Sequence, residues 1–135
     1  MYNTRAVDFR PTVMFADDDP ETLKVAADAL EDGGFRVITA SDGQTALQEA
    51  LGRKVALIIL DISMPQVGGL EACHCLKAMP KTAKIPVVLT TSKKDPAARM
   101  MGERMNGSVR ILRKPFTPEE LVSTARQLVK HKSLL

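Results

Sequence analysis

The stretch VALIILDISMP, residues Val55–Pro65, decides the fold that this sequence predicts. Its six apolar residues from Val55 to Leu60 run without a polar break and stop at Asp61. A short, β-branched, unbroken apolar run is typical of a strand buried on both faces in the middle of a parallel sheet. A carboxylate at the end of such a strand lies where open α/β sheets place their binding sites. A lone Asp there also commonly begins a turn, so the interpretation of Asp61 depends on the rest of the chain.

Strand and helix patterns alternate five times along the 135 residues. We expect strands at residues 12–16, 35–39, 55–60, 86–91 and 109–113, with helices at about 19–33, 42–51, 70–79 and 95–105 and a last helix that begins at 117 and includes Leu128. Two helices begin with Asp followed by Pro, a capping residue and a residue suited to the first helical position, and a third begins with a capping box. This alternation predicts an α/β fold, a parallel sheet with helices on both faces.

Composition predicts one globular domain rather than a membrane or extracellular protein. Apolar residues make up 44% of the chain and charged residues 26%, both ordinary fractions. No apolar run approaches the roughly 20 residues that span a bilayer, and the first residues lack the apolar core of a signal peptide. We therefore expect a cytoplasmic protein without membrane contact, with a leader at residues 1–11, one domain at 12–130 and a tail at 131–135.

Charge is unevenly distributed along the chain. Residues 1–76 carry 6 Lys/Arg and 12 Asp/Glu, whereas residues 77–135 carry 13 and 4, for a total of +3. We expect one acidic and one basic end of the fold. The basic residues form no continuous run and are not interleaved with aromatic residues, so nucleic-acid binding is not the expected function.

Polar residues follow four of the predicted strands at the point where each ends. Parallel strands deliver these ends to one edge of the sheet, which collects Asp17, Asp18, Asp61, Thr91, Ser92 and Lys114. If the third strand lies beside the first, three carboxylates converge, and they cannot all ionise without large pKa shifts or a cation. Oxygen ligands favour a hard divalent ion such as Mg²⁺. A carboxylate beside Mg²⁺, an ammonium and a hydroxyl has what phosphoryl transfer requires.

Four motifs occur in a fixed order, each at a predicted strand end: ADDDPE (16–21), LDISMPQVGGLE (60–71), IPVVLTTS (85–92) and RKPF (113–116). In this order and at these intervals they resemble the receiver domain of two-component response regulators, over about Thr12 to Lys130. The resemblance implies a five-stranded parallel sheet of order 2-1-3-4-5 with five flanking helices, the doubly wound flavodoxin-like fold. It also supplies the strand order, which periodicity alone does not predict.

The resemblance assigns roles to the acidic residues. Asp61 matches the phosphoacceptor of the family. Asp17 and Asp18 match the acidic pair that holds Mg²⁺ (or Mn²⁺) directly or through water, and Ser63 matches the position whose backbone carbonyl ligates the metal. Aspartyl-phosphate hydrolases of the haloacid dehalogenase kind require an Asp as acid/base two residues after the nucleophile. Ser63 occupies that position here, which argues against this class.

The same resemblance assigns the remaining polar residues of the edge. Thr91 matches the hydroxyl that bonds the phosphoryl oxygen, and Ser92 matches the small residue whose backbone N–H points into the site. Lys114 matches the lysine that pairs with the phosphoryl group, and the Lys114–Pro115 bond would be cis. A flavin site is disfavoured, because the first loop is acidic where a phosphate needs N–H groups.

The implied function is a phosphorylation-dependent switch rather than an enzyme, a phosphoacceptor that assists its own phosphorylation and dephosphorylation. Its donor would be a sensor histidine kinase or a histidine phosphotransfer protein, and its output a protein partner bound through the fourth helix, fifth strand and fifth helix. Two alternatives stay open: a receiver-like binding module that works without phosphorylation, and the excised receiver of a larger regulator.

Several residues depart from the family pattern or attract other interpretations. Ile111 stands where the family often has the aromatic residue of the switch, and Gly68 stands where Asp or Asn is common. Cys73 and Cys75 flank His74, but on a helix they point about 200° apart and cannot chelate one ion together. Two further groups each have two interpretations. Three methionines form a partner surface or simply pack: Met100, Met101 and Met105. Six basic residues form a surface for an acidic partner or a solvated face: Lys93, Lys94, Arg99, Arg104, Arg110 and Arg113.

Overall fold

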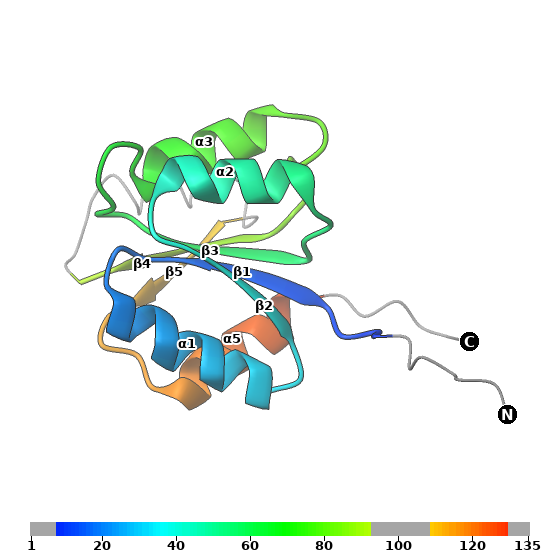
Figure 1. The fold of residues 1–135 in the computed structure, drawn as a ribbon, viewed down its shortest axis with the longest axis vertical. Coiled ribbons are helices and arrows are strands. Elements are labelled where there is room, and N and C mark those ends of the chain that lie inside the picture. The colour runs from blue at the N-terminus through cyan, green and yellow to red at the C-terminus, as the bar shows by residue number, and fades with distance from the viewer. Residues whose placement is uncertain (1–7, 93–108, 130–135) are drawn as a thin grey trace, which may run out of the picture.

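The structure, a computed structural model, describes residues 8–92 and 109–129, and within them five parallel strands form one sheet (Figure 1). The strand order is β2-β1-β3-β4-β5, which confirms the expected topology. The strands are β1 (Thr12–Ala16), β2 (Arg36–Ala40), β3 (Leu57–Asp61), β4 (Val87–Thr91) and β5 (Val109–Arg113). Four helices lie in the described ranges: α1 (Pro20–Asp32), α2 (Gly43–Gly52), α3 (Gly69–Ala78) and α5 (Pro118–Leu128).

Helices cover both faces of the sheet, as the alternating pattern predicts. Figure 1 shows α2 and α3 on one face and α1 and α5 on the other. The predicted helix at 95–105 falls outside the described residues, as do the three methionines and four of the six basic residues singled out above. No helix in the described part of the chain is long and apolar enough to cross a membrane.

The helix starts use side-chain capping, which the sequence predicts for α1 and which also occurs at α2. Asp19 accepts hydrogen bonds from the backbone N–H of Thr22 at 3.3 Å and from its hydroxyl at 2.6 Å. Asp42 accepts from the N–H of Thr45 at 2.7 Å. These contacts satisfy N–H groups that the first turn of a helix leaves without partners. The caps therefore set where the loops after β1 and β2 end.

The strand β3 forms the centre of the core. All five of its residues are buried, in agreement with an apolar run that has no solvent-facing side. Ile58 and Leu60 pack toward α2 and α3, whereas Leu57 and Ile59 pack toward α1 and α5. The strand begins two residues later than expected and includes Asp61, because the register with β4 extends to Thr90. The carboxylate therefore belongs to the sheet itself and not to a turn beyond it.

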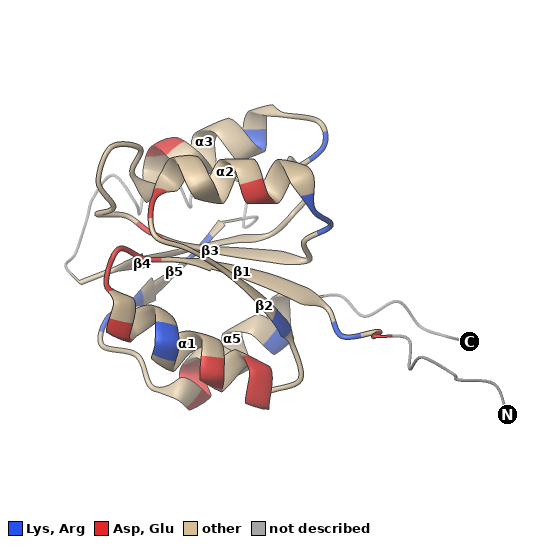
Figure 2. Cartoon of the chain, viewed as in Figure 1, with Lys and Arg blue, Asp and Glu red and all other residues tan. Residues whose placement is uncertain are grey.

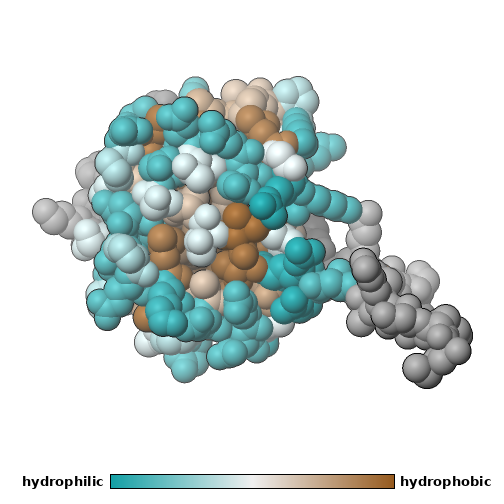
Figure 3. All heavy atoms as spheres, viewed as in Figure 1, coloured by the Kyte–Doolittle hydropathy of each residue, from teal (hydrophilic) through white to brown (hydrophobic). Residues whose placement is uncertain are grey.

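Hydrophilic residues predominate on the face of the molecule that Figure 3 draws. Figure 3 shows apolar atoms gathered between the two helix layers, with hydrophilic residues around them. On α3, Cys73 is buried while Cys75 and His74 are exposed, so this tripeptide does not present a common metal site. Burial raises the pKa of the Cys73 thiol to about 11, as expected for a packed cysteine.

Two glycines allow the loops to pass close to the ends of the strands. A Cβ on Gly69 would lie 2.3 Å from the carbonyl oxygen of Asp61, and a Cβ on Gly43 would lie 2.1 Å from that of Val67. Neither backbone oxygen can move without shifting its loop. The glycine at the start of α3 therefore fixes the position of the chain directly behind Asp61.

We predict that Gly69→Ala lowers the free energy of unfolding by about 1–3 kcal/mol, the usual cost of overpacking. Urea denaturation followed by circular dichroism measures this change. Gly52→Ala serves as the matched control, because a Cβ at this exposed end of α2 meets nothing within 4 Å. The control should stay within about 0.5 kcal/mol of the wild type. Equal stability of both variants would show that the loop accommodates the added methyl.

Candidate functional site

Three carboxylates meet at the carboxyl edge of the sheet. The register Ala16↔Leu60 between β1 and β3 places Asp17 beside Asp61, since each directly follows its paired residue. One carboxylate oxygen from each of Asp17, Asp18 and Asp61 lies within 4.8 Å of the others. Asp17 and Asp61 are 1% and 5% exposed, whereas Asp18 is exposed. The cluster therefore has a buried floor and one acidic residue at the solvent side.

Lys114 enters this cluster from the end of β5. Its Nζ lies 2.6 Å from Oδ2 of Asp17 and 3.5 Å from Oδ1 of Asp61. Its backbone N–H donates to the carbonyl of Thr91 at 2.8 Å, and the peptide bond to Pro115 is cis, as expected. The ammonium thus bridges the two buried carboxylates, with its shorter contact to Asp17.

The Asp17 carboxylate is held from two sides. One oxygen accepts the hydrogen bond from Lys114, and the other accepts from the backbone N–H of Asp19 at 2.9 Å. The sequence predicts Asp19 only as a helix cap, and its second contribution comes from its main chain. Since the first turn of α1 begins at this point, the cap of α1 and the orientation of Asp17 are coupled.

Burial and like charge set the electrostatics of Asp61. Burial raises the pKa of Asp61 and the charge of Asp17 raises it further, while Lys114 and a backbone hydrogen bond from Ser63 act in the opposite direction. Burial alone would lower the pKa of Lys114, but its hydrogen bond to Asp17 and the two carboxylate charges raise it overall. With Asp61 ionised, three negative charges face a single ammonium. A hard cation would relieve this imbalance, and the donor set of oxygens fits Mg²⁺.

The remaining predicted residues also lie along this edge. Thr91 ends β4 and is buried, Ser92 follows it and is exposed, and Ser63 is exposed two residues after Asp61. Ile111 is partly buried and packs against the core cluster on the α2–α3 face. An aliphatic side chain therefore occupies the position at which receiver domains often carry an aromatic residue.

Thr90 is a residue that sequence analysis did not single out. It pairs in register with Asp61 across β3 and β4 and is fully buried. Its hydroxyl finds no hydrogen-bond partner within the described part of the chain, which is an unusual state for a buried polar group. The only signal in the sequence is a doubled threonine at the end of an apolar run.

The fold and site together define a doubly wound α/β protein with an acidic, lysine-bearing edge. Residues 13–126 match the response regulator receiver domain family, so the chain belongs to this family of two-component systems. It is 40% identical over 122 residues to the probable transcriptional regulator ycf29 of Porphyra purpurea, covering 90% of this chain and 58% of that protein. The chain spans about half the length of the curated relatives it matches.

Solved structures agree with this assignment. The chemotaxis protein CheY4 of Vibrio cholerae shares 28% identity and a TM-score of 0.81, covering 89% of this chain and 99% of that one. The receiver domain of the sensor histidine kinase PA1611 of Pseudomonas aeruginosa has a similar fold, with 22% identity, a TM-score of 0.78 and coverage of 88% and 97%. The expected fold class and family are thus confirmed.

We predict that Asp61→Asn stabilises the protein at pH 7 in Mg²⁺-free buffer. The folded state raises the pKa of Asp61, so between its ordinary value of 3.8 and the raised value the folded state binds more protons than the unfolded state. The unfolding free energy of the wild type therefore falls as pH rises through this window, and the penalty persists above it. The amide removes the penalty, by an amount within the ~1–3 kcal/mol typical of uncompensated buried polar groups.

Urea denaturation between pH 4 and pH 8 measures the effect. The advantage of Asp61→Asn should grow with pH and disappear near the ordinary pKa of an aspartate. Asp28→Asn is the control, since this carboxylate is 63% exposed and only pairs with Lys24 on the surface of α1. A constant difference between Asp61→Asn and the wild type at every pH would contradict the electrostatic explanation.

Proposed function

We propose that this chain is a phosphorylation-dependent switch of a two-component phosphorelay and that Asp61 is its phosphoacceptor. The observation that carries the proposal is the position of Asp61, a buried carboxylate 3.5 Å from the ammonium of Lys114 and grouped with Asp17 and Asp18. A nucleophile for phosphoryl transfer needs charge neutralisation and fixed geometry more than covalent activation. Membership in the receiver family supports this use of the site.

The metal of the proposed reaction would be Mg²⁺ or Mn²⁺, held by the carboxylates of Asp17, Asp18 and Asp61 and the backbone carbonyl of Ser63. When bound, the ion supplies charge neutralisation for the phosphoryl oxygens. The PA1611 receiver domain was solved with a magnesium ion coordinated in its active site cleft, which supports a similar role for the acidic cluster here. Asp18 is the solvent-exposed member of the cluster, so it would hold the ion from the solvent side.

In the proposed reaction a carboxylate oxygen of Asp61 attacks the phosphorus of a phosphohistidine on a sensor kinase or phosphotransfer protein. The new bond is an acyl phosphate, the phosphorus–nitrogen bond breaks, and its electron pair stays on the imidazole. Lys114 then pairs with the phosphoryl oxygens, and the hydroxyl of Thr91 and the N–H of Ser92 donate to them. Water then attacks the phosphorus of the acyl phosphate, the phosphorus–oxygen bond to Asp61 breaks and inorganic phosphate leaves. This hydrolysis returns Asp61 to its resting carboxylate, so the chain assists both its own phosphorylation and its dephosphorylation.

The proposed output is a change of surface that a protein partner reads. The hydroxyl of Thr91 would move toward the phosphoryl group, and β5 and α5 would respond together with the helix expected at 95–105. Ile111 packs into the core in place of an aromatic switch residue, so the change would be transmitted by aliphatic packing. We place the switch in the cytoplasm. If the chain is the receiver of a longer regulator, the output could be transcriptional control, as named for the relative in Porphyra purpurea.

Intact mass spectrometry after incubation with acetyl phosphate tests the proposal. We expect a single phosphoryl adduct on the wild type in the presence of Mg²⁺ and none in EDTA. Asp61→Asn should remove the adduct, whereas the surface control Asp28→Asn should form it as the wild type does. Because the acyl phosphate hydrolyses, samples are compared over a time course rather than at one point.

Two outcomes would contradict the assignment. An adduct that persists in Asp61→Asn would place the phosphoryl group on another residue. A folded wild type that binds Mg²⁺ but accepts no phosphoryl group from acetyl phosphate or from any of several histidine kinases would favour the alternative, a binding module that works without phosphorylation.

We also predict that Mg²⁺ stabilises the folded protein through the acidic cluster. A ligand that binds only the folded state raises the unfolding free energy by about 2.7 kcal/mol at one hundred times its dissociation constant. Thermal melting at increasing MgCl₂, with NaCl matched for ionic strength, should show a rising midpoint for the wild type and for Asp28→Asn. Asp17→Asn should lose this rise. An equal rise in Asp17→Asn would mean that the ion binds elsewhere.

A further inference from the structure

A second chemically distinct feature lies at the opposite edge of the sheet from Asp61. A hollow of about 290 Å³ opens at the amino ends of β1 and β2, beside the end of α2. It is lined by Thr12, Arg36, Val37, Ile38, Arg53 and Lys54. The parallel strands run from this edge to the acidic one, so the hollow lies a full strand length from the proposed phosphoacceptor.

Every charged residue that lines the hollow is cationic. Arg36 comes from the start of β2, and Arg53 and Lys54 come from the loop after α2. Figure 2 shows basic segments at this end, in the loop after α2 and in the segment before β1, with acidic segments beside them before β1 and at the end of α1. Three cations from two separate parts of the chain thus face one small space.

The nearby acids neutralise this charge only in part. Asp8 lies 3.5 Å from Arg36 but is held by hydrogen bonds from Arg10, which lower its pKa to about 2. Glu49 pairs with Arg53 at 2.7 Å along α2. Neither acid lines the hollow.

The lysine of the hollow has no such partner. Within residues 8–92 and 109–129, Lys54 forms no ion pair or side-chain hydrogen bond, so its charge is uncompensated. Arg10 does not line the hollow and is itself paired with Asp8 at 2.8 Å, with the charge of Glu31 also nearby, so the uncompensated charge of the lining is that of Lys54. The hollow therefore retains excess positive charge.

Neutral groups complete the lining. Thr12 and Arg36 are paired in register, so their side chains point to the same face of the sheet as that of Ile38, which packs with the α2–α3 core. Arg36 donates its N–H to Pro11, and Ala40 accepts from Asp17, so these residues of β2 face β1. The N–H of Val37 consequently points to the open side of the edge strand, where it can donate to a ligand.

Cationic side chains near the end of a helix are often simply solvated by water, or they cap the helix. Lys81 does so here, because its ammonium donates to the carbonyl of Leu51 in the last turn of α2. Capping does not account for Arg36, which lies on β2.

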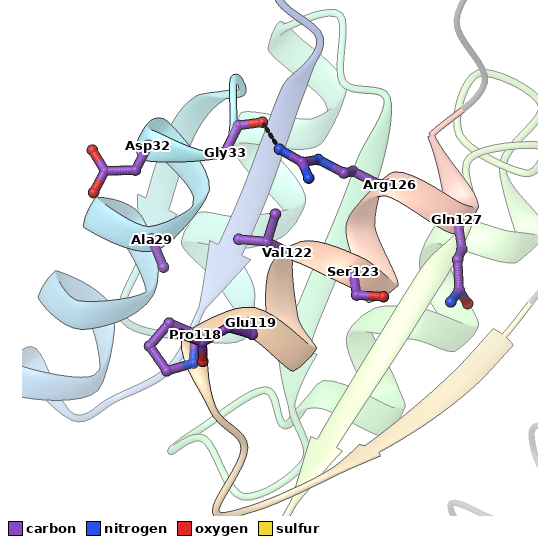
Figure 4. Close-up of a pocket in the computed structure, with 9 residues that line it drawn as sticks. All are labelled: Ala29, Asp32, Gly33, Pro118, Glu119, Val122, Ser123, Arg126 and Gln127. Carbon is purple, nitrogen blue, oxygen red and sulfur yellow. Dashed lines mark hydrogen bonds between the residues drawn. The ribbon is translucent and has the colours of Figure 1, made fainter.

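The larger hollow of about 610 Å³ between α1 and α5 offers a contrast (Figure 4). Its lining carries Asp32 and Glu119, and its one cation, Arg126, donates to the carbonyl of Gly33 at 3.1 Å.

We propose that the hollow at the amino edge binds a small phosphate-bearing anion, held by Arg36, Arg53 and Lys54. Guanidinium groups match the geometry of phosphate oxygens through paired N–H donors, and a lysine adds a compact charge. Small-molecule pockets usually occupy about 300–1,000 Å³, and this hollow of about 290 Å³, just below that range, suits a ligand no larger than a diphosphate or a mononucleotide. The site uses none of the residues assigned to phosphoryl transfer, so its existence does not depend on that function.

Titration of the Mg²⁺-free protein with pyrophosphate, followed by ¹H–¹⁵N NMR, tests the proposal. We expect saturable shifts of the amides of Val37, Arg53 and Lys54. The double variant Arg53→Gln/Lys54→Gln should bind at least ten times more weakly. The matched control Lys24→Gln/Lys84→Gln removes two exposed lysines elsewhere and should bind as the wild type does. Parallel titrations use inorganic phosphate and AMP. Tighter binding of pyrophosphate or of AMP than of inorganic phosphate supports a phosphate-bearing ligand, and the comparison shows whether the second phosphate or the nucleoside contributes.

The proposal fails on any of four results. Shifts that do not saturate, equal weakening in the control variant, or shifts centred on Lys114 would each show that the hollow is not a phosphate site. Saturable binding of polyglutamate without binding of pyrophosphate would assign the hollow to an acidic protein segment instead. Thermal melting of both variants confirms that each is folded before its titration is interpreted.

Discussion

The contact on which the carboxyl edge depends is the ion pair between Lys114 and Asp17. At 2.6 Å it joins the end of β5 to the end of β1, across the two strands that lie between them. Asp17 is almost completely buried, and a buried carboxylate without a partner is costly, so the lysine makes its ionised state tolerable. The same ammonium also reaches Asp61, and it cannot neutralise both carboxylates. The resting site is therefore left with an excess of negative charge.

This excess connects the fold to the proposed chemistry. Burial and the neighbouring Asp17 raise the pKa of Asp61, so ionisation of this carboxyl costs more in the folded chain than in water. A divalent cation would offset this cost and favour the carboxylate form that acts as a nucleophile. The strand register, the glycine behind Asp61 and the cap of α1 all serve to hold these groups at fixed positions. Thr90 is buried in register with Asp61, and Ile111, at the position where receiver domains often carry an aromatic residue, packs in the core.

Much of this structure could be predicted from the sequence, because its signals are local. The apolar run before Asp61, the Asp-Pro starts and the capping box each act within a few residues, and the structure confirms the α/β alternation. Strand order could not be worked out that way and came from the resemblance of four motifs, since periodicity does not say which strands are neighbours. The pairing of Lys114 with Asp17, 97 residues away, is a property of the folded sheet. The hollow lined by Arg36, Arg53 and Lys54 was missed for the same reason, because separate surface cations in a sequence look like ordinary solvated residues.

The most direct test of the central claim is to identify the residue that carries the phosphoryl group. Borohydride reduces an acyl phosphate of aspartate to homoserine, which peptide mass spectrometry locates after proteolysis. Treatment of the protein with acetyl phosphate and Mg²⁺ before reduction should produce homoserine at position 61, and omission of Mg²⁺ should prevent it. Homoserine at position 17 or 18 instead would contradict the assignment of those residues to the metal and of Asp61 to the phosphoryl group.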